Sequence, residues 1–325
     1  MKLFSLSTIL VSILLFISNM FNPITLDDDA PVAGLIEALG DGPSVNQVDK
    51  TVDIVSAEIG RDIVFNGFSK GKEKSSKKQS KHFVCTSCHN VVKEDFDLSV
   101  SDPESRLLYT TQKGIPFLQG TTLYGAVNRT SFYNGDYEKQ YGELVDEARH
   151  DIRKAIQLCA TECAQGRALK SWEIESILAY LWTIDLKVSD LNLTETEKTL
   201  IENAKRDDEN KAEAISVLKS KYLQASPADF SYPPEDRKIG YKGKEGNPQN
   251  GKLIYDSSCL HCHKNQRYSY LHLDHSRLTM KWLSKKAQSY SRHSIYQVVR
   301  YGVDSHTGKR SYICLLYTSP SPRDS

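Results

Sequence analysis

The chain has 325 residues, enough for one large hydrophobic core or two modest ones. Its 42 basic and 41 acidic residues nearly cancel, so the net charge gives no reason to expect nucleic acid or a charged membrane surface as a partner. A hydrophobic content of 39% is typical of a globular protein and excludes a chain built from many membrane spans.

The N-terminus is strongly apolar. Lys2 is followed by "LFSLSTILVSILLFI", in which serines and a threonine are the only polar residues. A basic residue before a short apolar run is typical of a secretory signal peptide, which we assign to residues 1–21. The usual small-residue cleavage pattern is poor here ("ISN"), so a membrane anchor over residues 3–20 is the alternative. We expect export to the periplasm, with anchoring left open, and an acidic lead-in segment over residues 22–43.

Two short segments, "HFVCTSCHN" and "DSSCLHCHK", each contain a Cys-x-x-Cys-His motif. In c-type cytochromes the two thiols of such a motif bond to the haem vinyl groups and the histidine ligates the iron. A zinc ribbon is the competing interpretation, but its cysteine pairs usually lie about 15–20 residues apart, whereas 170 residues separate these motifs. Zinc also leaves the histidine after each motif unexplained. The sequence therefore predicts two covalent haem c groups, attached through Cys85, Cys88, Cys259 and Cys262, with His89 and His263 as iron ligands.

The first domain is predicted over residues 44–190. Apolar residues between positions 48 and 63 recur with helical spacing, and "GRDIVFNG" resembles the end of the first helix in cytochrome c domains, where a glycine permits close helix contact. The segment "YGELVDEARHDIRKAIQLCATEC" is strongly helical, and its apolar face includes Cys159 and Cys163. Further on, "WEIESILAYLWTIDL" resembles the terminal helix of such a domain, which crosses the first helix.

The rest of the chain contains a lysine-rich loop, a linker and a second domain. The loop "SKGKEKSSKKQSK" precedes the first motif and is interpreted as solvated surface, with a docking patch for an acidic redox partner as the alternative. Residues 191–232 are charged and helix-prone, which favours a helical linker. Residues 233–313 contain the second motif. The predicted fold class is therefore mainly α, with two tandem cytochrome c-type domains.

The last residues match a sequencing adapter. From Cys314 to Asp324, eleven consecutive residues agree with one reading frame of a transposase adapter used in shotgun libraries. We interpret residues 314–325 as adapter, which leaves the second domain incomplete at its C-terminus. The adapter's first base would complete the codon of Ile313, and a codon that begins with AT in this context encodes isoleucine or methionine. Because "GKRSY" matches the usual context of a distal methionine, we predict that Ile313 replaces one.

Each haem iron has a second axial position, and its ligand strongly influences the reduction potential. Methionine is common in electron-carrier cytochromes, but the chain contains only Met1, Met20 and Met280. The first haem therefore cannot take a methionine from its own domain. Its remaining candidates are a lysine, an open position, or one of Cys159, Cys163, His82 and His150.

For the second haem, Met280 follows the motif histidine by only 17 residues, which favours a core position over ligation. His272, His275 and lysines are lesser candidates.

A family resemblance bears on the first haem. The segments "GTTLYGAVNRTSFYNGDY" and "IRKAIQLCATECAQGRALKSWEIESILAYL", with both motifs, resemble the first domain of dihaem thiosulfate dehydrogenases and, more distantly, the haem subunit of sulfur-oxidising (Sox) complexes. The similarity covers residues 110–185. It implies a cysteine distal ligand ahead of a short loop, and aligning Gly166–Arg167 with that loop makes Cys159 both the ligand of the first haem and the candidate catalytic residue. The second cysteine, Cys163, departs from the family pattern.

The sequence predicts electron transfer through both haems between periplasmic or membrane redox partner proteins. The alternative, implied by the resemblance, is a thiosulfate dehydrogenase-like oxidoreductase that joins two thiosulfate ions to tetrathionate at a haem ligated by His89 and Cys159. Such a site would bind a small sulfur oxyanion, for which the nearby cations are Arg129, Arg149, Arg153 and Arg167. Electron transfer is the preferred interpretation because one unusual ligand does not define a substrate pocket. No nucleic-acid partner is expected.

Overall fold

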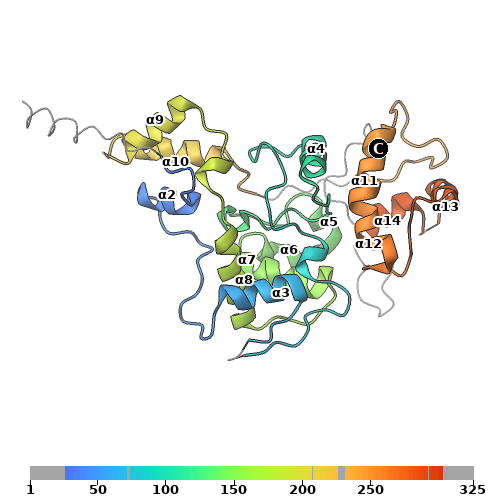
Figure 1. The fold of residues 1–325 in the computed structure, drawn as a ribbon, viewed down its shortest axis with the longest axis horizontal. Helices are drawn as coiled ribbons and strands as arrows, with labels where there is room; N and C mark the ends of the chain where they lie inside the picture. The colour runs from blue at the N-terminus through green and yellow to red at the C-terminus, as the bar shows by residue number, and fades with distance from the viewer. Residues whose placement is uncertain (1–25, 72–73, 207, 226–230, 292, 303–325) are drawn as a thin grey trace, which may run out of the picture.

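A computed structural model of the chain describes residues 26–71, 74–206, 208–225, 231–291 and 293–302 (Figure 1). The predicted signal peptide or anchor and the adapter-like tail lie outside the described residues. Within the described residues, no helix is long and apolar enough to cross a membrane.

The fold is mainly α, as the sequence predicted. Pairing between extended segments is limited, in the part of the chain that the structure describes, to isolated bridges. The α-helices are α2 (Val32–Ala38), α3 (Ala57–Asn66), α4 (Pro103–Lys113), α5 (Tyr137–Tyr141), α6 (Leu144–Ala148), α7 (Ile152–Leu158), α8 (Ser171–Leu181), α9 (Glu195–Ala204), α10 (Lys211–Ser220), α11 (Pro248–Ile254), α12 (Leu260–His263), α13 (Arg277–Ala287) and α14 (Ile295–Tyr301). The short helical turns are η1 (Cys85–Ser87), η2 (Ala126–Asn128), η3 (Cys159–Cys163), η4 (Trp182–Ile184), η5 (Val188–Asp190), η6 (Tyr255–Cys259) and η7 (Lys264–Gln266).

The first domain is built around the contact of α3 with α8. Gly60 of α3 lies so close to α8 that an added Cβ would be 1.8 Å from the carbonyl oxygen of Ser176. Only glycine leaves room for this approach. Ser56 caps the start of α3 by accepting hydrogen bonds from its first turn, and Gly67, with a φ of 76°, ends it. The predicted close helix contact at this glycine is confirmed.

Buried side chains from α3 and α8 form the centre of the first core. They are aliphatic, and they face each other across the contact. The members from these two helices are Ile59, Ile63, Val64, Ile177, Leu178 and Leu181.

The segment "YGELVDEARHDIRKAIQLCATEC" is not one helix, and the prediction of a continuous one is wrong. α5 ends at Gly142, whose φ of 59° and ψ of −143° suit glycine. α7 starts separately because Asp151 leaves helical geometry and accepts hydrogen bonds from the amides of Arg153 and Lys154. α7 then continues into the π-helical turn η3. The apolar spacing runs on across both breaks, so it carries no sign of them.

The lead-in segment and the charged linker pack on each other. α2 from the lead-in lies with α9 and α10 from the linker at one end of the molecule (Figure 1). Lys219 and Asp41 form an ion pair of 2.6 Å across this unit. The helical character of the linker was predicted, but its packing on α2 was not. The shared core includes Leu35, Ile36, Ile201, Ala214 and Leu218.

The second motif lies on η6 and α12, which follow α11, and α11 packs against α4 (Figure 1). Ile254 of α11 is buried in a cluster with Leu107 of α4 and Phe117. The amide of Asn250 also donates to the carboxylate of Glu104 at 3.3 Å. The two motif-bearing parts are therefore in direct contact.

Candidate functional site

A large cavity lies between the first motif and the segment formed by α7 and η3. It encloses about 1460 Å³ of empty space, including its open mouth. Apolar side chains of α3 and α8 also line it. The sulfur and imidazole side chains on its wall are Cys85, Cys88, His89, Cys159 and Cys163.

The side chain of His89 is held by the loop that follows it. Its Nδ1 atom lies 2.6 Å from the backbone oxygen of Thr121. Because a carbonyl oxygen only accepts hydrogen bonds, Nδ1 is the protonated nitrogen and Nε2 keeps its lone pair for a metal ion. Gly120 packs against the ring, where an added Cβ would lie 2.4 Å from His89 Cε1. Burial lowers the pKa of His89, which favours the neutral imidazole that ligates metals.

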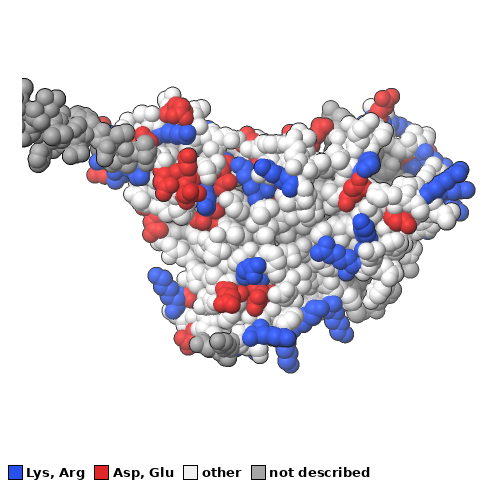
Figure 2. Space-filling model, viewed as in Figure 1, with Lys and Arg blue, Asp and Glu red and all other residues white. Residues whose placement is uncertain are grey.

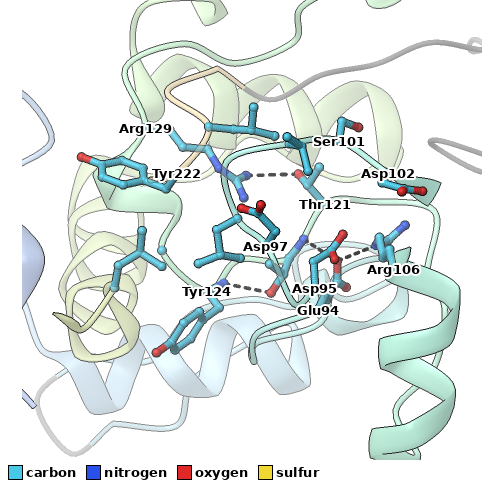
Figure 3. Close-up of a pocket in the computed structure, with 16 residues that line it drawn as sticks. Glu94, Asp95, Asp97, Ser101, Asp102, Arg106, Thr121, Tyr124, Arg129 and Tyr222 are labelled. Carbon is cyan, nitrogen blue, oxygen red and sulfur yellow. Dashed lines mark hydrogen bonds and ion pairs between the residues drawn. The ribbon is translucent and has the colours of Figure 1, made fainter. Parts of the chain in front are cut away.

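A buried ion pair supports the loop that carries Thr121. Arg106 Nε donates to Glu94 Oε2 at 2.9 Å, and the two side chains are 7% and 5% exposed. Arg106 Nη2 also donates to the carbonyl of Leu118 at 2.8 Å, and Glu94 accepts from the amide of Thr122 at 3.2 Å. Figure 3 shows Glu94 and Arg106 together beside this loop. The pair therefore holds the backbone on both sides of Thr121.

Figure 3 shows a smaller hollow next to this loop, of about 680 Å³ including its open side. Arg129 lines both this hollow and the large cavity, and its Nη1 donates to Thr121 Oγ1 at 3.3 Å. The carboxylates of Asp95 and Asp97 accept hydrogen bonds from nearby serine hydroxyls. Asp95 and Asp97 are thus hydrogen-bonded to neighbouring serines. Arg129 places a cation beside Thr121, whose carbonyl oxygen accepts the hydrogen bond from His89.

Cys159 and Cys163 lie on the opposite wall, on η3. Tyr141 Oη lies 3.4 Å and Tyr133 Oη 3.8 Å from Cys163 Sγ. The hydrogen bond from Cys159, joined by those from the two tyrosines, lowers the pKa of Cys163 against the opposing effect of burial. The pKa of Cys159 is raised, first by its hydrogen bond to Cys163 and then by burial. The two sulfurs therefore differ, because Cys163 accepts hydrogen bonds and Cys159 keeps its proton.

The tyrosines beside Cys163 form a cluster of rings. Tyr133 lies edge-on to Tyr137 with ring centroids 5.0 Å apart, and the rings of Tyr137 and Tyr141 stack at 6.3 Å. Sequence analysis missed this cluster, although "TSFYNGDYEKQY" contains all its members. The tyrosines converge because the chain turns at Gly135–Asp136, directly before α5 begins at Tyr137.

Other predicted side chains lie away from the cavity. His82 and His150 are exposed at the surface. Of the arginines expected near the cysteines, Arg129 lines the cavity. The others form ion pairs with carboxylates, namely Arg149 with Glu138, Arg153 with Glu175 and Arg167 with Glu173.

The second motif repeats the arrangement of the first histidine. Cys259 ends η6, and Cys262 and His263 lie on α12. His263 Nδ1 lies 3.1 Å from the backbone oxygen of Leu271. Burial lowers the pKa of His263, as it does for the first motif histidine. Here too Nε2 is the nitrogen left for a metal ion.

The two motifs lie against each other. The hydroxyl of Ser258 donates to the carbonyl of Phe117. His261 stands between the cysteines of the second motif, and Ser87 stands between those of the first. Burial, and then the charge of Arg267, lower the pKa of His261 to about 4, while a hydrogen bond with the backbone of Ser87 opposes the decrease. The side chain of His261 in the second motif thus contacts the backbone of Ser87 in the first.

The residues considered as distal ligands of the second haem lie at the surface. Met280 is 38% exposed on α13, a helix without a buried residue, so its predicted core position is wrong. Leu278 and Trp282 of this helix are exposed as well, whereas Leu283 and Ala287 are partly covered and the helix contacts α14. His272 and His275 are exposed and lie near carboxylates, Asp274 and Asp256 respectively. Ile313 lies outside the described residues.

Comparisons with protein-family models, with curated proteins and with solved structures found no match. Within the described ranges, no group of three or more histidine, cysteine, aspartate or glutamate side chains is arranged to hold a metal ion. A covalent haem site requires a different arrangement: a pair of thiols, a histidine with one ring nitrogen available, and an apolar cavity. The residues around the first motif fit that description.

Proposed function

We propose that this chain is an exported dihaem c-type cytochrome that transfers electrons between redox partner proteins through two covalently bound haems. The observation that carries the proposal is the shared arrangement of the two motif histidines. In both His89 and His263, Nδ1 meets a backbone carbonyl oxygen and Nε2 stays available. This contact orients a ligating histidine and increases its basicity.

In the first site, Cys85 and Cys88 would form the thioethers and His89 would ligate the iron. A bound haem c supplies a one-electron couple between Fe(III) and Fe(II). Thr121 and Gly120 hold the imidazole from the loop, and aliphatic side chains of α3 and α8 form an apolar wall of the cavity. A dry and rigid surrounding suits electron transfer, because the protein reorganises little when the charge on the iron changes.

The contact between the motifs supports an internal relay. Ser258, just before the second motif, donates to the carbonyl of Phe117, and His261 of the second motif interacts with the backbone of Ser87 in the first. Electrons that enter at one site would then reach the other within the same chain. The wall of the first cavity would supply its distal ligand from η3, where the sequence resemblance favours Cys159.

The lysine-rich loop supports a docking role. Lys70, Lys77, Lys78 and Lys81 are exposed just before the first motif in the sequence. The lower edge of the molecule in Figure 2 carries mainly basic side chains, while the end formed by α9 and α10 mixes both signs. A redox partner with an acidic surface would be steered toward such an edge.

A thiosulfate dehydrogenase-like oxidoreductase is the second candidate. It is favoured by the presence of two thiols, Cys159 and Cys163, and of Arg129 in the wall of one cavity. In that reaction two thiosulfate ions join through a new sulfur–sulfur bond to give tetrathionate, and the two electrons released pass one to each haem. Among the predicted arginines, Arg129 is the one that lines this cavity, so it would be the cation that faces an oxyanion there.

Reduction of the purified, haem-loaded protein distinguishes the two functions. The electron-transfer proposal predicts that a small reduced cytochrome reduces both haems and that thiosulfate does not. Reduction by thiosulfate, with tetrathionate as the product, would favour the second candidate. If neither donor reduces the haems, both proposals fail.

A further inference from the structure

The first cavity contains a second cysteine, Cys163, beside two tyrosines, Tyr133 and Tyr141, to which sequence analysis assigned no role. We propose that Tyr133 and Tyr141 set the electron affinity of the first haem by hydrogen bonding to a thiolate on Cys163, and that Cys163 rather than Cys159 is its distal ligand. This inference rests on the proposed function, because it requires a haem at the first motif.

The hydroxyl groups that reach Cys163 are good hydrogen-bond donors. Tyr141 Oη lies 3.4 Å from the sulfur, and this tyrosine is only 2% exposed. A buried tyrosine hydroxyl normally finds a partner. Because a thiol is a weak donor, the hydroxyl donates and the sulfur accepts. The Cys163 sulfur, which lines the cavity, is therefore a hydrogen-bond acceptor with a lone pair available.

Tyr133 supplies the other hydroxyl, but it shares its proton. Its Oη lies 3.8 Å from Cys163 Sγ and 3.4 Å from the carbonyl oxygen of Ala155. Its backbone is in the left-handed region, with a φ of 52°. Non-glycine residues in this region are strained and often lie at functional sites. The strained backbone turns the ring of Tyr133 toward the sulfur, and the shared proton makes its hydrogen bond the weaker one.

Cys159 has a different role in this arrangement. It lies one turn earlier on the same wall of the cavity and hydrogen-bonds to Cys163. The π-helical turn between them widens the helix, and such turns are frequent at functional sites. If haem is bound with His89 as one ligand, either Cys159 or Cys163 would supply the other. The sulfur that already accepts hydrogen bonds from hydroxyl groups is the better placed, and Cys159 then acts as a further donor.

Hydrogen bonds to a thiolate ligand withdraw electron density from sulfur and so favour Fe(II). Losing one shifts the balance toward Fe(III). For Tyr141→Phe we expect the ratio of Fe(II) to Fe(III) in the first haem, at a fixed applied potential, to fall about tenfold, which corresponds to about 59 mV for a one-electron couple. Tyr133→Phe should cause a smaller fall, because its proton is shared with Ala155. Tyr137→Phe keeps the ring cluster and should leave the ratio unchanged.

The test uses the full chain, purified with haem bound, in a spectroelectrochemical titration and by EPR of the oxidised protein. Cys163→Ala should lose the low-spin signal of a thiolate ligand, and Cys159→Ala should keep it. The reverse pattern, or an unchanged potential in Tyr141→Phe, overturns the inference. If Cys163→Ala does not accumulate as folded protein, the potential of Tyr141→Phe decides alone. A chain without covalent haem at the first motif would instead refute the proposed function, which is a separate result.

Discussion

Removing the carboxylate of Glu94 should weaken both the first domain and its histidine site. In Glu94→Ala the guanidinium of Arg106 loses its partner at 2.9 Å, and both groups are almost fully buried. The same carboxylate accepts hydrogen bonds from the amide of Thr122 and the side chain of Asn90, which lose their acceptor as well. The loop that carries Thr121 therefore loses its support on one side.

The size of the effect follows from the burial of the pair. Breaking a buried ion pair by removing one partner costs about 3–5 kcal/mol, because an uncompensated charge is left behind. We expect Glu94→Ala to lower the free energy of unfolding by about 4 kcal/mol, which reduces the folding equilibrium constant roughly a thousandfold. A matched exposed pair is Lys154 with Glu147, whose side chains are 56% and 76% exposed. Lys154→Ala should cost less than about 1 kcal/mol.

Urea unfolding followed by circular dichroism measures the two effects. Glu94→Leu combined with Arg106→Met should recover part of the loss, because a buried pair replaced by apolar side chains leaves no lone charge. If haem is attached at the first motif, as we propose, its absorption spectrum should also change in Glu94→Ala, since the backbone oxygen of Thr121 holds His89. Equal losses in Glu94→Ala and Lys154→Ala would refute the reasoning.

Three further changes test the packing and the charge of the first domain. Gly60→Ala should cost about 1–3 kcal/mol, measured by urea unfolding, because its Cβ would collide with the backbone of Ser176. Gly120→Ala should displace the ring of His89 and change the low-spin spectrum of the bound haem. Burial raises the pKa of Asp185 to about 6, so the stability provided by its protonated form is present below about pH 4 and is lost as the pH rises through 6. Asp185→Asn should therefore be more stable than the parent protein at pH 7 and equally stable at pH 4.

Controls are available for these variants. Gly34→Ala introduces a Cβ with its nearest neighbour at 3.9 Å, so it should not destabilise the protein, and a loss equal to that of Gly60→Ala would contradict the helix-contact account. Gly42→Ala meets open space and serves the same purpose for Gly120→Ala. Parallel stability curves from pH 4 to pH 7 for Asp185→Asn and the parent protein would contradict the role given to Asp185.

Local signals in the sequence predicted much of the helical structure. The glycine at position 60 correctly indicated the close contact of α3 with another helix, whereas the helical spacing from position 48 began too early, because the helix starts at Ala57. Both signals depend on residues close together in the sequence, where the spacing of apolar residues and the size of a side chain are visible without a structure. The breaks at Gly142 and Asp151 were missed because the apolar spacing continues through them, although glycine and a capping aspartate are themselves the cause. Met280 was expected in a core, but it lies on the exposed side of α13, a helix without a fully buried residue.

The candidate site could be predicted only in part. The cysteines and histidines of the motifs form a pattern in sequence, so they were identified without a structure. The hydroxyls on Cys163 come from residues 22 and 30 positions away, and the acceptor of His89 lies 32 positions away. The backbone turns that bring these groups together leave no periodic trace in the sequence. The contact between Ser87 and His261 also depends on how two distant parts of the chain pack, which local patterns do not contain.

The haem content of the purified chain tests the central claim most directly. The protein, produced in a host that matures c-type cytochromes, is denatured and its covalently attached haem is measured by the pyridine haemochrome spectrum, with mass spectrometry of the peptides that contain Cys85 and Cys259. The account predicts two covalent haems per chain, one of which is lost in Cys85→Ala with Cys88→Ala and the other in Cys259→Ala with Cys262→Ala. A chain that folds with no covalent haem, or that binds zinc through these cysteines instead, would contradict it.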